Sequence, residues 1–138
     1  AYARSRRFQA AVLEPFDRTP AGGRRGPIAP QPPSGLAISM GPQWPNAQRE
    51  DCQVLSVFTP SRHGRRPVLA FLHGGAFATG GGELAWYDGH LLAAEQDVVV
   101  VPITYRLGAL GFWLPDGSVG PSPAYTDIVV ALEWIQAY

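Results

Sequence analysis

Two apolar runs of strand-forming residues, separated by a short helical stretch, constrain the fold of this chain more than any other feature. The runs are 67–72 and 98–105, and each is apolar at successive rather than alternate positions. Such runs are typical of strands that are covered on both faces of a sheet. The stretch 87–96 between them contains the adjacent leucines and alanines of a short helix. A strand, a crossover helix and a second strand predict an α/β unit.

A third run of strand-forming residues, 54–58, lies just before this unit and ends at Thr59-Pro60. Only the basic turn 62–66 separates it from the run 67–72. Two strands joined by so short a turn predict a β-hairpin.

The last segment has the pattern of a helix. Ser122 is a good N-cap residue, and Pro123 suits the first helical turn. Four apolar residues then share one face at helical spacing, namely Ile128, Val129, Leu132 and Ile135. No capping glycine follows before Tyr138, and the first residue is Ala1 rather than methionine. We expect residues 1–138 to be the leading part of a longer protein.

Glycine and proline are concentrated early in the chain. Residues 19–35 contain five prolines and four glycines, and 36–49 show no regular period either. We therefore expect an irregular loop over about 19–49, a kind of segment that is often functional in a compact domain.

Charge and composition exclude several classes of function. Eleven arginines balance eleven acidic residues, which gives no electrostatic reason to expect a nucleic acid or an anionic membrane as partner. The absence of lysine excludes a phosphate-binding P-loop and Schiff-base chemistry. No apolar run approaches the roughly 20 residues of a membrane span. The lone Cys52 cannot form an internal disulfide, is expected to be a buried thiol, and favours a reducing compartment.

The stretch with the clearest chemical meaning is Phe-Leu-His-Gly-Gly-Ala-Phe, residues 71–77, directly after a predicted strand. Adjacent Gly74 and Gly75 allow a sharp turn with amides free to point at a ligand. Consecutive amides at such a turn can stabilise an oxyanion, and losing one such donor typically costs about 100- to 1,000-fold in rate. In hydrolases a His-Gly-Gly pattern after the third strand supplies part of the oxyanion hole.

Three blocks in this order, 50–60, 67–77 and 105–112, together with the predicted helix over 127–135, resemble the type-B carboxylesterases. That family includes cholinesterases and bacterial para-nitrobenzyl esterases. The resemblance is good from Glu50 onward and looser before it. It implies an α/β-hydrolase fold, with a mixed sheet that is antiparallel at its start and flanked by helices, incomplete in this chain. The chain departs from the family pattern at Gln53 and Thr104, where leucine and asparagine are usual.

The resemblance also implies a reaction, the hydrolysis of small-molecule carboxylic esters by a serine, an acidic residue and a histidine. Gly74 and Gly75 would supply two oxyanion-hole amides. The elbow Gly-x-Ser-x-Gly is absent, since its nearest counterpart, 116–120, begins with aspartate. We expect all three catalytic side chains beyond residue 138, so that this segment alone is inactive and needs the remainder of its polypeptide. No metal or cofactor is implied.

Substrate contacts are expected from Ala76 and Phe77, next to the two glycines, and from Trp44 at the mouth of the site. Trp44 is equally well interpreted as an aromatic residue that pins its loop to the core. The resemblance makes His73 a structural residue beside the oxyanion loop rather than a general base. His63 and His90 are expected at the surface, because their spacing is not that of metal ligands.

Two ion pairs are expected to support the fold. A buried arginine needs a carboxylate partner, because an unpaired buried charge is very costly. We expect Arg106 to pair with Asp127 and Arg7 to pair with Glu50.

Two other functions remain open. The chain can instead belong to an inactive relative that serves as a binding or adhesion module, in which glycine or alanine replaces the serine. Residues 80–85 also match a dinucleotide-binding fingerprint formally. They begin eight residues after the strand rather than immediately, and no acidic residue follows the next strand.

Overall fold

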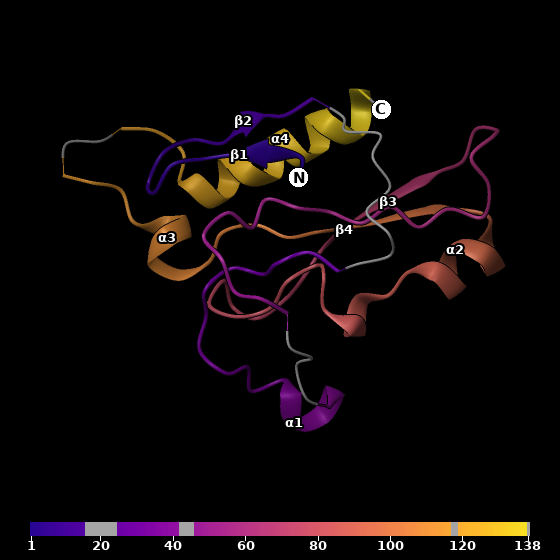
Figure 1. Cartoon of the computed structure of the whole chain (residues 1–138), viewed down its shortest axis with the longest axis horizontal. Coiled ribbons are helices and arrows are strands. Elements are labelled where there is room, and N and C mark those ends of the chain that lie inside the picture. Colours follow the sequence, from indigo (N-terminus) through magenta and orange to yellow (C-terminus); the bar gives the residue numbers. More distant parts are fainter. Residues whose placement is uncertain (16–24, 42–45, 117–118, 138) are drawn as a thin grey trace.

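The computed structural model describes residues 1–15, 25–41, 46–116 and 119–137. The centre of the fold is a parallel pair of strands, β3 (Val68–Leu72) and β4 (Val99–Ile103). The register places Val68 opposite Val99 and Leu72 opposite Ile103. Between the strands the chain forms a 3-10 turn, Ala85–Tyr87, and the helix α2 (His90–Gln96). Figure 1 shows this α/β unit with α2 packed beside the strands.

The predicted hairpin is wrong. The segment 54–58 forms antiparallel bridges with β4, at Leu55 opposite Ile103 and at Phe58 opposite Val100, and β4 therefore lies between this segment and β3. Phe58 and Val100 exchange two backbone hydrogen bonds of 2.9 Å. The reason is burial, since β4 is the most apolar run and is hydrogen-bonded on both edges. The arrangement is a mixed sheet that is antiparallel at its start.

The expectation that both faces of 67–72 are covered is also wrong for the described part of the chain. Val68, Leu69 and Leu72 are each at least 45% exposed, and in the described part of the chain β3 pairs with β4 only.

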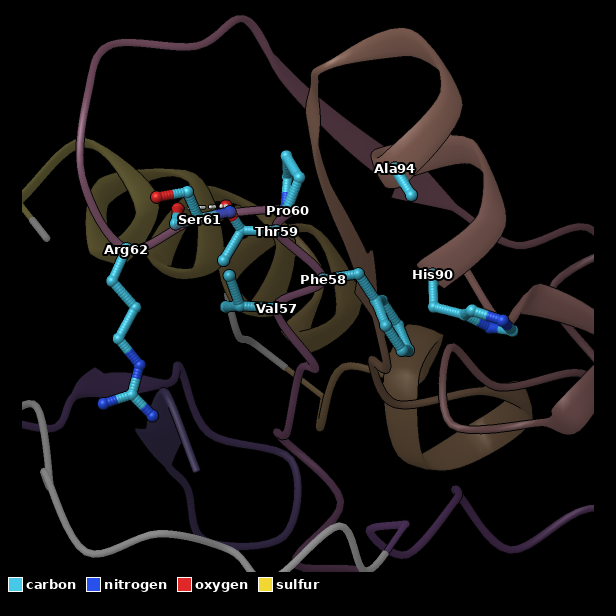
Figure 2. A pocket seen from close by; sticks show the side chains of 8 residues that line it. All are labelled: Val57, Phe58, Thr59, Pro60, Ser61, Arg62, His90 and Ala94. Atoms are coloured by element: carbon cyan, nitrogen blue, oxygen red, sulfur yellow. Dashed lines mark hydrogen bonds between the residues drawn. The ribbon is translucent and has the colours of Figure 1, made fainter.

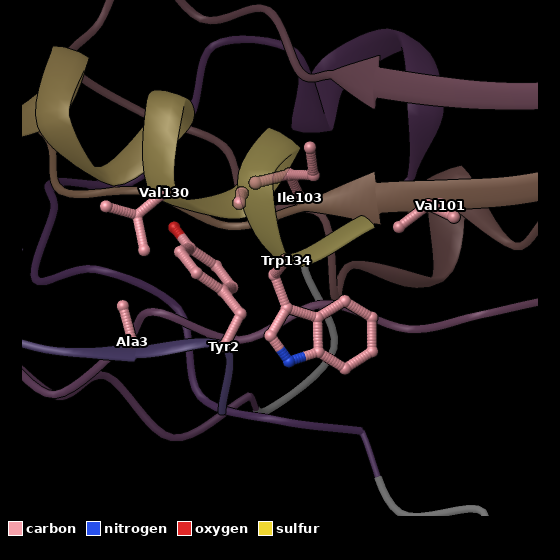
Figure 3. Close-up of a cluster of buried hydrophobic side chains, with 7 residues drawn as sticks. Tyr2, Ala3, Val101, Ile103, Val130 and Trp134 are labelled. Atoms are coloured by element: carbon pink, nitrogen blue, oxygen red, sulfur yellow. The ribbon is translucent and has the colours of Figure 1, made fainter. Parts of the chain in front are cut away.

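The N-terminal residues form a small hairpin that the sequence pattern does not predict. Its strands are β1 (Ala3–Arg4) and β2 (Val12–Leu13), which pair antiparallel. The hairpin packs on α4 (Pro123–Ala137). The helix is present as expected, but the face shared by Ile128, Val129, Leu132 and Ile135 is not its buried one, because Val129 and Leu132 are 52% and 46% exposed. Figure 3 shows Tyr2 directed toward α4, and its hydroxyl donates to the Thr104 carbonyl at 2.9 Å. The main core thus joins three segments far apart in sequence, with Tyr2, Ala3, Val101, Ile103, Val130, Ala131 and Trp134 buried together.

Two short helices are not predicted by the sequence, and one of them lies in the stretch expected to be irregular. They are α1 (Ala37–Met40) and α3 (Gly108–Phe112). The arms of the proline-rich loop also pair with each other, because Ile28 bridges to Gln48 in parallel. At the start of α4, Ser122 precedes the first helical residue as expected. Its hydroxyl is nevertheless buried and, among the described residues, bonds to nothing, so the N-cap hydrogen bond is not made.

Arg106 and Asp127 form a fully buried ion pair. Arg106 donates to the Asp127 carboxylate through Nε at 2.8 Å, through Nη2 at 2.7 Å and through its backbone amide at 3.0 Å. The remaining guanidinium protons bond to the carbonyls of Arg6, Gln9 and Pro123. All five donors of the guanidinium are therefore satisfied, which offsets the cost of burying the charge.

Arg7 and Glu50 also form an ion pair, but it is exposed to solvent. The Arg7 Nε donates to Glu50 Oε2 at 2.9 Å, and Nη2 contacts the other carboxylate oxygen. The arginine lowers the pKa of Glu50 through this hydrogen bond. Solvent screens such a pair, so it contributes far less to stability than the buried pair.

The buried pair yields a test of the fold. Asp127→Ala leaves a buried guanidinium without its counter-charge, and we expect the free energy of unfolding to fall by about 3–5 kcal/mol. Urea unfolding of the complete polypeptide that contains these residues measures this. Glu50→Gln at the exposed pair is the control and is expected to leave the unfolding free energy unchanged within error. Equal effects of the two substitutions would contradict the importance of the buried pair.

Candidate functional site

The loop after β3 has an unusual backbone. Gly75, Ala76 and Phe77 all have positive φ angles, of 120°, 52° and 58°. The turn closes on the Gly75 carbonyl, which accepts hydrogen bonds from the amides of Ala78 at 3.0 Å and Thr79 at 3.1 Å. A Cβ at Gly75 would lie 2.1 Å from the Thr79 carbonyl oxygen, so only glycine fits there. The same atom at Gly74 would meet nothing within 4 Å.

This loop presents a run of unpaired amides. Within the described ranges, the N–H groups of Gly74, Gly75 and Ala76 make no hydrogen bond. Gly74 and Ala76 are exposed, and Gly75 is half-buried. Such successive donors can bind an anion or a developing oxyanion. The sequence points to the two glycines but not to the Ala76 amide, because a left-handed conformation at alanine leaves no sequence signal.

His73 is buried behind the loop, with 4% of its surface exposed. Its Nδ1 lies 2.9 Å from the Gly74 carbonyl oxygen, and its ring stacks on Tyr105 at a centroid distance of 4.5 Å. Burial lowers its pKa. Among the described residues, Nε2 has no partner. A general base would need an orienting carboxylate, and the ring instead bonds to the backbone of the loop.

Phe77 and α3 brace the other side of the loop. The Gly108 amide, at the start of α3, donates to the Phe77 carbonyl at 2.8 Å. The Phe77 ring packs against Phe112 at 5.0 Å and is 49% exposed. It therefore presents an aromatic face beside the unpaired amides. Trp44, the third expected substrate contact, lies outside the described residues.

The glycines at 80–82 face protein rather than a ligand site. Added Cβ atoms at Gly80, Gly81 and Gly82 would lie 2.2 to 2.7 Å from His73, Ile28 and Ile103, respectively. Their role is close packing of the chain, which argues against the dinucleotide interpretation. The segment 116–120 is the nearest counterpart of the Gly-x-Ser-x-Gly elbow, and its residues Gly117 and Ser118 lie outside the described residues.

A hollow of about 610 Å³ lies between α2 and the segment 57–62 (Figure 2), and none of residues 74–77 lines it. His90, at one end of it, bonds through Nδ1 to Asp88 at 2.6 Å, and Asp88 also binds Arg25 at 2.6 Å. Asp88 thus binds both His90 and Arg25, and neither Asp88 nor Arg25 lines the hollow. His90 and His63 are both exposed.

The described residues contain no group of three or more histidine, cysteine, aspartate or glutamate side chains placed to hold a metal ion. They also contain no helix with the length and apolar character needed to cross a bilayer.

Comparisons with known proteins give a consistent result. The model of the Carboxylesterase family matches residues 2–138. The chain is 42% identical over 113 residues to the probable N-octanoylanthranilate hydrolase AqdA2 of Rhodococcus erythropolis, covering 80% of this chain and 25% of that protein. It is 44% identical over 115 residues to the para-nitrobenzyl esterase of Bacillus subtilis (strain 168), covering 80% and 23%. The chain spans about a quarter of the length of these relatives.

Solved structures of esterases also superpose on this chain. An esterase from the anaerobe Clostridium hathewayi, which can hydrolyse aliphatic aromatic polyesters, superposes with a TM-score of 0.79 at 30% identity, covering 98% of this chain and 29% of that chain. A thermophilic PNB esterase gives a TM-score of 0.70 at 37% identity, covering 80% and 23%.

The backbone of the loop predicts different tolerance at its two glycines. Gly75→Ala forces a left-handed alanine against the Thr79 carbonyl, and we expect a loss of about 1–3 kcal/mol in unfolding free energy from strain alone. Gly74→Ala places its methyl group in open space and is expected to change stability by less than about 0.5 kcal/mol. Thermal unfolding of the two variants distinguishes them, and equal melting temperatures would contradict the loop geometry.

Burial of His73 predicts a dependence of stability on pH. The pKa of His73 is below its ordinary value of 6.5 in the folded state, so the unfolded chain takes up a proton first as pH falls through 6.5. Folding stability supplied by the neutral ring is therefore present above pH 6.5 and is lost below it. Tyr87 and Tyr105, the titratable groups that face the ring, stay neutral in this range.

The test compares the wild type with His73→Asn. The unfolding free energy is measured in urea at pH 7 and pH 5. We expect the wild type to lose more stability between these pH values than the variant, and identical losses would contradict a neutral buried His73.

Proposed function

Because the chain belongs to the carboxylesterase family of α/β-hydrolases, we propose that its complete polypeptide hydrolyses carboxylic esters through a serine nucleophile. This segment supplies the oxyanion-binding loop, and the nucleophile, acid and base lie outside residues 1–138. The observation that carries the proposal is the run of unpaired amides that begins at Gly74, placed directly after β3.

The chemistry follows from these parts. The serine oxygen attacks the ester carbonyl carbon as its proton passes to a histidine, and the carbonyl π electrons move onto oxygen. The Gly74 and Gly75 amides donate hydrogen bonds to that oxyanion and lower the barrier. The oxyanion then collapses, and the alcohol leaves with the proton from the imidazolium. Water, deprotonated by the same histidine, releases the acid from the acyl-enzyme.

The substrate is a small ester with an apolar or aromatic group beside the reacting carbonyl. Ala76 and Phe77 extend the loop from the amides, and the half-exposed Phe77 ring offers an apolar contact there. The relatives' names fit this range, since one is a para-nitrobenzyl esterase and another a probable N-octanoylanthranilate hydrolase.

The proposal is tested on the complete polypeptide and on residues 1–138 alone. The complete polypeptide is expected to hydrolyse p-nitrophenyl acetate and to react covalently with a fluorophosphonate probe. Residues 1–138 alone are expected to do neither.

The complete polypeptide, after inactivation by the fluorophosphonate probe, serves as the control for background hydrolysis. If the complete polypeptide shows neither turnover nor labelling, the esterase proposal fails and an inactive binding module takes its place. Turnover by residues 1–138 above the control would refute the claim that this segment holds only part of the site.

A further inference from the structure

The peptide geometry of the loop links its hydrogen-bonded carbonyls to the amides that, among the described residues, are unpaired. A trans peptide group is planar, and its C=O and N–H point in opposite directions. The His73 carbonyl belongs to the same peptide group as the Gly74 N–H. The Gly74 carbonyl likewise belongs to the same group as the Gly75 N–H. Fixing the direction of each carbonyl therefore fixes the direction of the next amide.

Both of these carbonyls are held by buried aromatic side chains. The Tyr105 hydroxyl donates to the His73 carbonyl at 3.0 Å. His73 Nδ1 donates to the Gly74 carbonyl at 2.9 Å. A carbonyl oxygen can only accept, so Nδ1 carries the ring proton and Nε2 the lone pair. Each of the two candidate oxyanion donors thus has its own anchor on the opposite side of its peptide plane.

The anchors are themselves fixed. The rings of His73 and Tyr105 stack with their planes 13° apart, and both residues are at most 4% exposed. Tyr105 follows β4 and precedes the buried Arg106, so its position is set by the core. Gly80 leaves room for the imidazole, because a Cβ there would lie 2.2 Å from Nδ1.

We propose that Tyr105 and His73 are positioning residues that aim the Gly74 and Gly75 amides at the oxyanion and strengthen them as donors. A hydrogen bond accepted by a peptide carbonyl polarises the whole group and makes its N–H a better donor. This role rests on the proposed esterase function, since the oxyanion is the species that forms during ester hydrolysis.

Tyr105→Phe in the complete polypeptide tests the proposal most cleanly, because it removes one hydroxyl and keeps the stacked ring. We expect kcat for p-nitrophenyl acetate to fall by about tenfold, part of the 100- to 1,000-fold loss that follows removal of a donor. KM should stay within twofold. The affinity for a trifluoromethyl ketone, which forms a tetrahedral oxyanion on the serine, should fall by the same factor as kcat. Tyr125→Phe is the matched control, because that hydroxyl lies on an exposed tyrosine of α4.

Two substitutions of His73 complete the test. His73→Asn retains an N–H donor at the δ position and should keep more kcat than His73→Leu, which has none. Unchanged kcat and ketone affinity in both Tyr105→Phe and His73→Leu would overturn the positioning role while leaving the esterase function intact. A rise in KM that matches the fall in kcat would also overturn it, because a general loss of structure affects binding equally. Absence of hydrolysis by the wild type would overturn the proposed function and this inference together.

Discussion

The buried pair of Arg106 and Asp127 is the interaction on which the rest of this structure depends. Arg106 is only 2% exposed, and its buried charge is tolerated because a carboxylate and three backbone carbonyls satisfy all five guanidinium donors. Those partners lie in the N-terminal hairpin region and in α4, whereas Arg106 itself follows β4. Neutralising one charge thus brings together three segments that are separated by up to about 100 residues. The apolar cluster around Tyr2 and Trp134 fills the space between them.

The same end of β4 positions the loop that carries the chemistry. Tyr105 holds the His73 carbonyl, and Gly108 holds the Phe77 carbonyl, so the loop is fixed at both ends by neighbours of Arg106. Left-handed Ala76 and Phe77 each cost of order 1 kcal/mol. Hydrogen bonds from His73 to the Gly74 carbonyl, and from the amides of Ala78 and Thr79 to the Gly75 carbonyl, offset that strain. Because the carbonyls are satisfied within the protein, the amides of the same peptide groups remain available to a ligand.

Sequence patterns predict the parts of this fold that depend on local order. The strands β3 and β4 follow from runs of successive apolar residues, and the presence of the helix α4 follows from the spacing of its apolar residues. The buried face of α4 does not follow, because Val129 and Leu132 are exposed whereas Val130, Ala131 and Trp134 are buried. The cost of a buried charge predicts a carboxylate partner for Arg106, which is Asp127. The pairing of 54–58 is not predicted, because this segment pairs with the most apolar strand, β4, rather than with the strand nearest to it in sequence. The two-residue strands β1 and β2 are too short to show a period. In the candidate site, the glycines are visible in the sequence, whereas the left-handed Ala76 and the donor to each carbonyl depend on tertiary contacts.

We propose that the Gly74 and Gly75 amides are aimed at an oxyanion by the hydrogen bonds that hold the carbonyls of their own peptide groups. The crystal structure of the complete polypeptide with a phosphonate bound covalently to its serine tests this geometry. We expect one phosphonate oxygen to lie about 2.7–3.1 Å from the nitrogens of Gly74 and Gly75. Tyr105 and His73 are expected to keep their hydrogen bonds to the carbonyls of His73 and Gly74. A phosphonate oxygen directed away from this loop, or held by other donors, would show that these amides do not bind the oxyanion.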